Sequence, residues 1–229
     1  MGMSIDWLPF VLQTSDPLFP TGSYAHSFGL EEFVRLSGAS DEAALGSFLE
    51  LHILPALTYQ ELPYLRFAHT YSAADDLSAL VALDQEINAW KIPGELRSAS
   101  RRLGARRLDI LLKTASTPFL AAVGKCVAAG EMPGHHLTVS GAQYAGIPLE
   151  AALMTYLYQT LSSYCVAALK LLRIGQEACQ RVLSGCLESA PEVLRESLAV
   201  ERPQAGCFNP LLEIASMRHA TAFERLFIS

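Results

Sequence analysis

The stretch that decides the fold is residues 148–172, PLEAALMTYLYQTLSSYCVAALKLL, the most apolar part of the chain. Its large apolar side chains recur at the three- and four-residue spacings of an α-helix and mark one broad face. The stretch is nearly long enough to span a bilayer. However, Glu150, Gln159 and several Ser and Thr residues interrupt it. We therefore expect a central buried helix rather than a membrane span.

Shorter segments with helical periodicity flank this stretch, separated by prolines and glycines. We expect helices at 22–36, 41–55, 62–71, 75–90, 95–113, 118–129, 176–187 and 191–200, and a last helix that begins at Pro210. Pro55 should end the second of these, because proline lacks the N–H that the helix needs. There is no alternating strand pattern and no Asn-Gly or Asp-Gly hairpin signal. The sequence predicts an all-α, single-domain helical bundle of roughly eight to ten helices over residues 1–229.

The composition argues for a protein of the cytoplasm that offers an apolar surface to a partner or buries a large core. Of the 229 residues, 51% are hydrophobic and 17% are charged, and the net charge is -6. This negative charge argues against nucleic-acid binding. No secretory signal opens the chain. The five cysteines are widely spaced, odd in number and without a CxxC pair, which favours free thiols in a reducing, cytoplasmic compartment.

Few residues suggest catalysis or metal binding. No nucleotide-binding loop is present. Ser23 and His26 lie three residues apart, as a nucleophile and its base would on a helix, but no carboxylate is placed to orient the histidine. His135 and His136 offer metal ligands without a nearby third, so a solvated, glycine-flanked loop is the favoured interpretation. We expect a protein that is not an enzyme, with a nickel carrier and a Ser/His hydrolase as the alternatives.

A cluster of five arginines falls between residues 95 and 113. It consists of Arg97, Arg101, Arg102, Arg106 and Arg107. Two interpretations stay open: a solvated helix face, or a docking stripe for an acidic partner.

The N-terminal stretch 12–33, LQTSDPLFPTGSYAHSFGLEEF, carries a more specific signal. It resembles the N-terminal signature of the urease accessory protein UreF family. The matching residues are Leu12, Gln13, Ser15, Pro20, Gly22, Tyr24, Ser27, Gly29, Leu30 and Glu31.

Further segments resemble the same family. Residues 170–176, KLLRIGQ, are similar to a family motif in which Arg173 stands where proline is usual. The end of the chain, MRHATAFERLFIS, matches the family's C-terminal motif, although Ala220 and Ile228 replace its usual glutamate and arginine. The resemblance therefore runs from one end of the chain to the other.

This resemblance implies an all-helical, homodimeric chaperone and adaptor for urease maturation. Such a protein bridges a UreD/UreH-like accessory protein and a UreG-like GTPase on the urease apoprotein. Nickel and GTP are handled through the partners, and no cofactor is bound tightly. The N-terminal segment 1–20 and the C-terminal tail 217–229 are expected to become ordered on partners.

The resemblance also assigns residues to the two partners. On the GTPase side they are Tyr24, Glu31, Lys170, Arg173 and Gln176. On the UreD/UreH side they are Arg218, His219, Arg225, Leu226 and Phe227. A cation such as Lys170 or Arg173 would act near the nucleotide of the GTPase.

Overall fold

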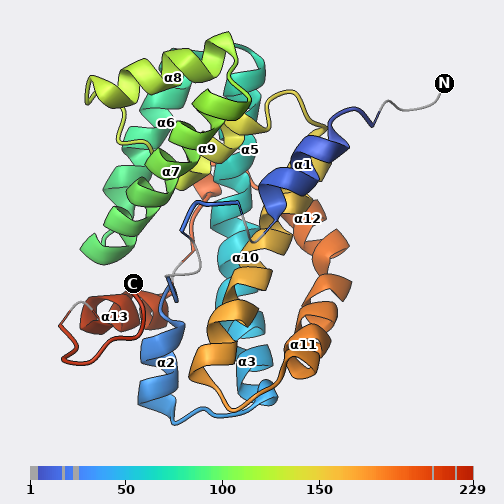
Figure 1. Ribbon diagram of the computed structural model, residues 1–229, viewed down its shortest axis with the longest axis vertical. Helices are drawn as coiled ribbons and strands as arrows, with labels where there is room; N and C mark the ends of the chain where they lie inside the picture. The colour runs from blue at the N-terminus through green and yellow to red at the C-terminus, as the bar shows by residue number, and fades with distance from the viewer. Residues whose placement is uncertain (1–4, 17–18, 23–25, 208, 220, 229) are drawn as a thin grey trace.

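The computed structural model describes residues 5–16, 19–22, 26–207, 209–219 and 221–228. Every regular element among them is helical, so the all-α prediction is confirmed (Figure 1). The α-helices outside the central rod described below are α1 (Leu8–Ser15), α2 (Leu30–Ser37), α6 (Leu77–Trp90), α7 (Gly94–Thr114), α8 (Pro118–Ala128), α9 (His136–Gln143), α10 (Leu149–Leu171), α11 (Gln176–Glu188), α12 (Ala190–Ala199) and α13 (Pro210–His219). A short 3₁₀ turn, η4 (Arg202–Gln204), precedes the last helix.

One continuous helical rod runs through residues 42–73. It consists of α3 (Glu42–Phe48), η2 (Leu49–Ile53), α4 (Leu54–Ala56), η3 (Leu57–Glu61) and α5 (Leu62–Ala73). The expectation that Pro55 ends a helix is wrong. A π-helical turn lies directly before each of Pro55 and Pro63, at η2 and η3. The wider π turn relieves the clash of the proline ring with the preceding turn and accommodates its missing N–H.

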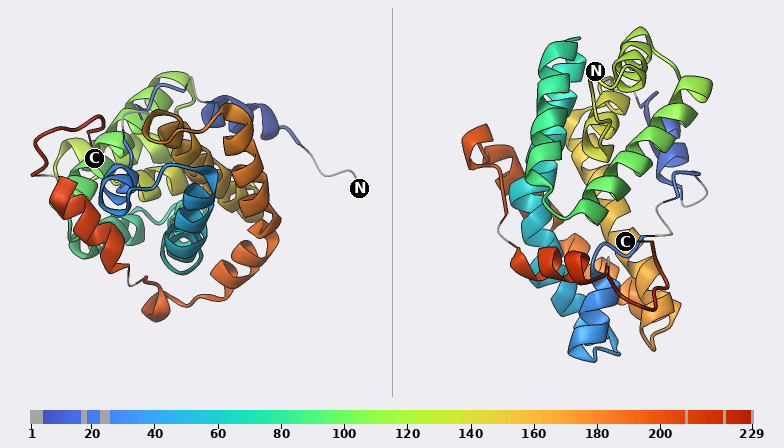
Figure 2. Two further views of the ribbon diagram at one scale, coloured as in Figure 1. Left: turned by 90° about the horizontal axis from the view of Figure 1, so that it is seen from below. Right: turned by 90° about the vertical axis from the view of Figure 1, so that its left-hand side faces the viewer.

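The rod and α10 form the centre of the molecule, as Figure 2 shows from two sides. Leu153, Leu157 and Leu161 of α10 are completely buried, which confirms the prediction of a central helix. The helices α1, α2, α11 and α12 pack around α10, and α6 and α9 pack against α5. No helix in the described part of the chain is long and apolar enough to cross a membrane.

The helix α9 replaces the solvated loop that we expected at His135 and His136. It lies against both α5 and α7, and residues 137–143 are all buried. Glycines allow these close approaches: a Cβ at Gly141 would lie 2.4 Å from Cβ of Ala68, and one at Gly104 would lie 2.1 Å from the carbonyl oxygen of Gly134. The segment packs as core because its small residues let two neighbours come near.

A buried carboxylate from another helix holds the start of α9. Asp84 of α6 accepts hydrogen bonds from the N–H groups of Gly134 (2.7 Å) and His135 (2.8 Å) and from the hydroxyl of Thr138. Burial raises the pKa of Asp84, and these three hydrogen bonds oppose that shift. Asp84 therefore caps α9 from some fifty positions earlier in the chain.

The helix α2 begins later than the expected 22–36. It starts at Leu30 because Phe28 and Gly29 have positive φ angles, of 47° and 93°, which a right-handed helix cannot contain. Asp76 and Thr117 cap α6 and α8, because their side chains accept from the N–H groups of Ala79 and Leu120.

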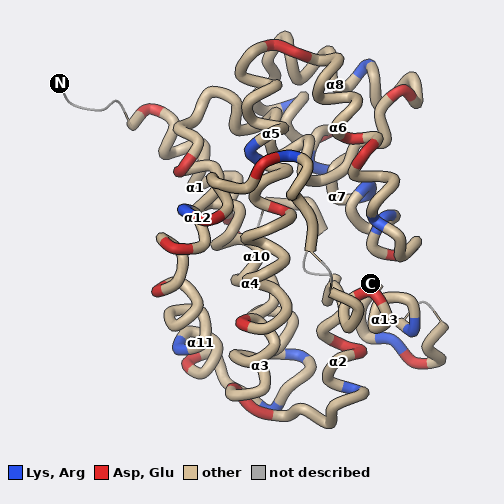
Figure 3. Tube along the Cα trace, turned by 180° about the vertical axis from the view of Figure 1, so that it is seen from behind, with Lys and Arg blue, Asp and Glu red and all other residues tan. Residues whose placement is uncertain are grey.

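The arginines along α7, blue in Figure 3, differ in their exposure to solvent. Arg101, Arg102 and Arg106 are exposed, whereas Arg107 is buried and donates to Oε1 of Gln143 at 2.6 Å. The solvated-face interpretation therefore holds for part of the cluster and is wrong for Arg107.

Candidate interaction site

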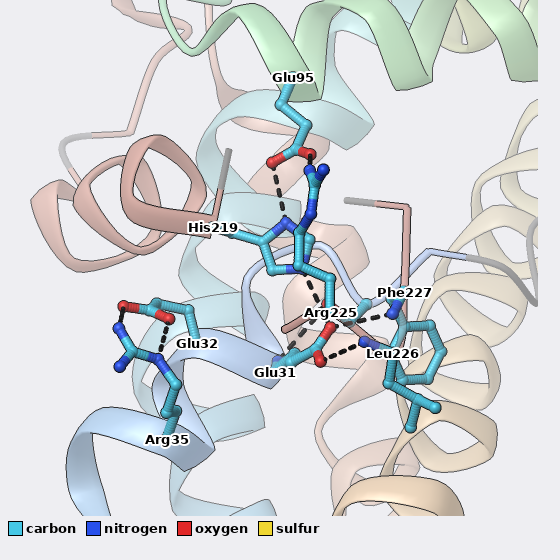
Figure 4. A network of polar contacts seen from close by, with 9 residues as sticks. Glu31, Glu32, Arg35, Glu95, His219, Arg225, Leu226 and Phe227 are labelled. Carbon is cyan, nitrogen blue, oxygen red and sulfur yellow. Dashed lines mark hydrogen bonds and ion pairs between the residues drawn. The ribbon is translucent and has the colours of Figure 1, made fainter. Parts of the chain in front are cut away.

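The C-terminal helix α13 lies across α2 and beside α7. Its close approach to α2 depends on Gly29, where a Cβ would meet Cδ2 of Leu212 at 3.3 Å. The chain then turns back, so that residues 221–228 return to the start of α2 (Figure 4). Residues from the two ends of the sequence meet here.

Glu31 of α2 holds the end of the chain. Its carboxylate accepts the backbone N–H groups of Leu226 at 2.7 Å and Phe227 at 3.0 Å. Charge-assisted hydrogen bonds of this kind are about twice as strong as neutral ones. Glu31 therefore fixes the position of the last described residues.

His219, at the end of α13, joins α2 to α7. Its Nε2 lies 3.0 Å from Glu31, and its Nδ1 lies 3.0 Å from Glu95 at the start of α7. The side chain is only 2% exposed. A neutral imidazole has one N–H and can donate to one carboxylate, whereas the imidazolium donates to both. Nη1 of Arg225 also lies 3.3 Å from Glu95.

A second acidic residue of α2, Glu32, is buried and paired with two arginines. Arg35 Nε lies 2.6 Å and Arg218 Nε lies 3.0 Å from its carboxylate. The hydrogen bond from Arg35 lowers the pKa of Glu32 despite the opposing effect of burial, and Arg218 lowers it further. We call Glu31, Glu32, Glu95, Arg218, His219 and Arg225, with the amides of Leu226 and Phe227, the C-terminal network.

The structure brings residues predicted for the two partners into contact. Glu31 and Lys170, predicted for the GTPase side, touch Phe227, predicted for the other side; Lys170 Nζ lies 5.2 Å from the centre of the Phe227 ring. Arg173 and Gln176 lie exposed around the start of α11, apart from this network. Tyr24 lies outside the described residues. The assignment of each residue to a partner stays a prediction.

Sequence reasoning missed an apolar ridge on α13. Leu211, Ile214 and Met217 recur every three residues, and their exposed fractions are 37%, 53% and 46%. The signal was in the sequence as a spacing of three, but only the packing of Ala215, Ser216 and His219 on the opposite face shows that it points outward. Phe223 and Leu226 expose further apolar surface in the following segment. Exposed apolar patches of this kind mark protein interaction sites.

The two histidines considered for a metal do not act as a pair. His135 is fully buried, and its Nδ1 and Nε2 lie 3.0 Å from Ser100 Oγ and 3.2 Å from Asn88 Oδ1. His136 instead faces the ring of Tyr156. Burial and nearby cations lower the pKa of His135 to about 3. In the described part of the chain, no three His, Cys, Asp or Glu side chains are grouped so as to hold a metal ion.

The pair considered for catalysis is only half described. Ser23 lies outside the described residues. His26 is buried and stacks on Phe28, with 5.5 Å between ring centres. Burial, with a smaller effect of Arg102, lowers the pKa of His26 to about 4.

Comparison with known proteins identifies the family. The sequence model of the UreF family matches residues 39–187. This chain belongs to the UreF family. It is 31% identical to the urease accessory protein UreF of Paenarthrobacter aurescens (strain TC1) over 229 residues, which cover 99% of this chain and 100% of the relative. It is 30% identical to the urease accessory protein UreF of Arthrobacter sp. (strain FB24) over 219 residues, 95% of each chain.

Of the C-terminal network, only Glu95 lies within the part of this UreF-family chain that the family model matches. The matched residues 39–187 include the rod, α7, α9 and α10. Glu31 and residues 218–227 lie outside them, although the two relatives align over nearly the whole length. The match thus identifies the helical body, and the geometry singles out the C-terminal network as the candidate site.

Proposed function

We propose that this chain is a urease accessory protein that acts as an adaptor without catalytic activity. It bridges a UreD/UreH-like accessory protein and a UreG-like GTPase on the urease apoprotein during GTP-dependent nickel insertion. Nickel and GTP reach it only through these partners, and it works as a cytoplasmic homodimer. Membership of the UreF family supports the urease role.

The observation that carries the adaptor role is the apolar ridge of α13 beside the C-terminal network. Leu211, Ile214 and Met217 present apolar side chains to solvent, and Arg218 and Arg225 lie next to them in the chain. An apolar centre with a charged rim is the usual anatomy of a protein interface. The UreD/UreH-like partner binds here in our proposal, and it orders the C-terminal tail further.

The GTPase in our proposal binds the neighbouring surface that includes Lys170, Arg173 and Gln176. Because Lys170 packs on Phe227, a partner that moves the tail also changes the surroundings of Lys170. Binding at one surface therefore changes the affinity at the other, and the reverse effect must be equal. To shift the GTPase between its nucleotide states, the adaptor must also bind one of these states more tightly than the other.

The test of the ridge is a binding measurement with the purified UreD/UreH-like protein of the same organism. Ile214→Asp places a charge at the centre of the ridge and should weaken binding at least about tenfold, which corresponds to about 1.4 kcal/mol. Leu51→Asp is the matched control, because Leu51 is likewise an exposed aliphatic side chain but lies on the rod, outside the ridge. Equal affinities of Ile214→Asp and the unchanged protein would contradict the proposed interface.

The test of the GTPase surface uses Arg173→Glu, because the Arg173 side chain is exposed and its reversal should not disturb folding. We expect weaker recruitment of the UreG-like GTPase and unchanged affinity for the UreD/UreH-like protein. Urease activation in a mixture of apo-urease, nickel, GTP and the accessory proteins then tests the whole proposal. Activation that does not depend on adding this chain would overturn it.

A further inference from the structure

A cavity of about 450 Å³ lies between the helices of the body and reaches α13 at Leu212 and Glu213. Polar side chains from five elements line one end of it: Glu61 of η3, Trp90 and Lys91 at the end of α6, Ser100 and Arg107 of α7, His136 of α9 and Tyr156 of α10. We call this end the polar pocket. A water molecule takes up about 30 Å³ in the liquid, so the cavity has room for more than a single water.

Two buried polar atoms in the polar pocket have no hydrogen-bond partner among the described residues: Nε of Arg107 and Nδ1 of His136. Arg107 is only 4% exposed, and it uses another nitrogen to donate to Gln143. An unsatisfied buried polar group costs about 1–3 kcal/mol, so two of them at one end of a cavity indicate a ligand.

The charge of the polar pocket selects the kind of ligand. Lys91 lies 4.7 Å from the Trp90 ring centre and, with Arg107, supplies two cations, whereas Glu61 supplies one carboxylate that accepts from the hydroxyl of Tyr156 at 3.1 Å. Burial, followed by the effects of Arg107 and Lys91, holds the pKa of His136 well below its usual value. The imidazole is therefore neutral at pH 7, and the pocket keeps a positive excess.

Two other acidic residues line the cavity. Asp16 is exposed to solvent, and water screens an exposed charge more strongly than a buried one, so Asp16 offsets little of the positive charge. Glu213 is half-buried, as Glu61 is, and it belongs to α13, which contributes no side chain to the polar pocket.

We propose that the polar pocket binds a small oxyanion, a phosphate-like or carboxylate-like group. Its oxygens accept from the Nε–H of Arg107 and the ammonium of Lys91. A metal cation fits poorly, because two fixed cations repel it and Glu61 is the one carboxylate in the pocket. This binding does not depend on the adaptor role, since the polar pocket lies within the helical body and the proposed partner surfaces lie outside it.

The test is isothermal titration calorimetry of the full-length protein with inorganic phosphate and, separately, with acetate, at constant ionic strength. We expect saturable one-to-one binding of at least one of the two, and the better probe distinguishes an inorganic oxyanion from a carboxylate. Arg107→Gln and Lys91→Met should each weaken that binding at least about tenfold. Arg106→Gln is the matched control, because Arg106 is the exposed neighbour of Arg107 on the same helix; it should leave the affinity within about twofold.

Lys91→Met keeps the test decisive if Arg107→Gln fails to fold, because it removes the second cation of the polar pocket. A loss of affinity in folded Lys91→Met supports the pocket. The proposal is overturned if neither anion binds saturably to the unchanged protein, or if Arg106→Gln weakens binding as much as the pocket variants do.

Discussion

Two networks of polar side chains hold this molecule together at different depths. The α9 network consists of Asp84, the amides of Gly134 and His135, and the side chains of Ser100, Asn88, His135 and Thr138, and it lies in the core. The C-terminal network, centred on Glu31 and His219, holds a segment whose neighbours Phe223 and Leu226 are exposed. Similar hydrogen bonds therefore contribute differently to stability, because leaving a polar group unpaired costs more free energy in the core than at the surface.

This difference indicates which region can change its conformation when a partner binds. Breaking the α9 network exposes buried donors with no water to replace their partners. Breaking the C-terminal network releases a short segment into water, where its amides find new partners. We therefore expect the first network to control stability and the second to control the position of the tail.

The largest effect should come from Asp84→Ala. It leaves the amides of Gly134 and His135 without their acceptor and removes the carboxylate from the hydroxyl of Thr138. At about 1–3 kcal/mol for each buried group, we expect the free energy of unfolding to fall by about 4 kcal/mol in urea titrations. Asp76→Ala, which removes the local cap of α6 at an exposed position, should cost only about 1 kcal/mol. Equal losses would contradict the comparison.

The next effect should come from Gly141→Ala. The added Cβ would lie 2.4 Å from Cβ of Ala68 and 2.8 Å from its backbone carbonyl carbon, so α9 and α5 must separate. We expect a loss of about 2 kcal/mol in the free energy of unfolding, although alanine favours a helix by about 1 kcal/mol. Gly185→Ala in α11 is the control: nothing lies within 4 Å of its added Cβ, so it should stabilise the protein. A stabilised Gly141→Ala would show that α9 is not packed as described.

A change of pH should act on the α9 network through His135. Its pKa in the folded state is about 3, against 6.5 for an unperturbed histidine. The unfolded chain therefore binds this proton more readily, and His135 should have no effect above pH 6.5. As the pH falls from 6.5 to 5, His135 alone should lower the free energy of unfolding by up to about 1.4 kcal/mol per pH unit, or about 2 kcal/mol in all, in addition to the losses from His26 and His136.

Urea unfolding at several pH values measures this slope. His135→Gln has no titrating ring and should flatten the slope by the same amount, while His26, whose folded pKa is about 4, continues to contribute. An unchanged slope in His135→Gln would mean that His135 is accessible to protons in the folded state.

The smallest effect on stability should come from Glu31→Gln. The amide replaces a carboxylate that holds Leu226, Phe227 and His219, so the tail loses its charged acceptor. We expect less than about 1 kcal/mol of lost stability but much faster amide hydrogen exchange at Leu226 and Phe227. Glu224→Gln, an exposed change in the same segment, should leave that exchange unaltered. If the two variants exchange alike, Glu31 does not hold the tail.

Sequence periodicity predicted most helices, because it records which face of each helix is buried. It placed α6, α8, α10 and α11 to within a few residues. It failed at Pro55, where a π turn carries the helix past the proline, and at α9, whose cap comes from Asp84 on another helix. Local sequence patterns contain no information about the π turn or about the contact between Asp84 and the start of α9.

The candidate site was predicted in part. Motif resemblance chose Glu31, His219, Arg225, Leu226 and Phe227, and all of them meet in the C-terminal network (Figure 4). It did not choose Glu32 or Glu95, since these residues acquire their roles only when α2, α7 and α13 come together.

By itself, the sequence determined the helical class, the buried α10 and the family, because hydrophobic spacing and motif spacing are properties of the chain in order. Only the tertiary structure decided that α9 is core and that the two ends of the chain share Glu31. It also decided that the Arg107 side chain is buried and lines the polar pocket, whereas its neighbours on α7 are exposed to solvent. Each of these depends on contacts between residues tens of positions apart, and their energies depend on burial, which no local pattern specifies.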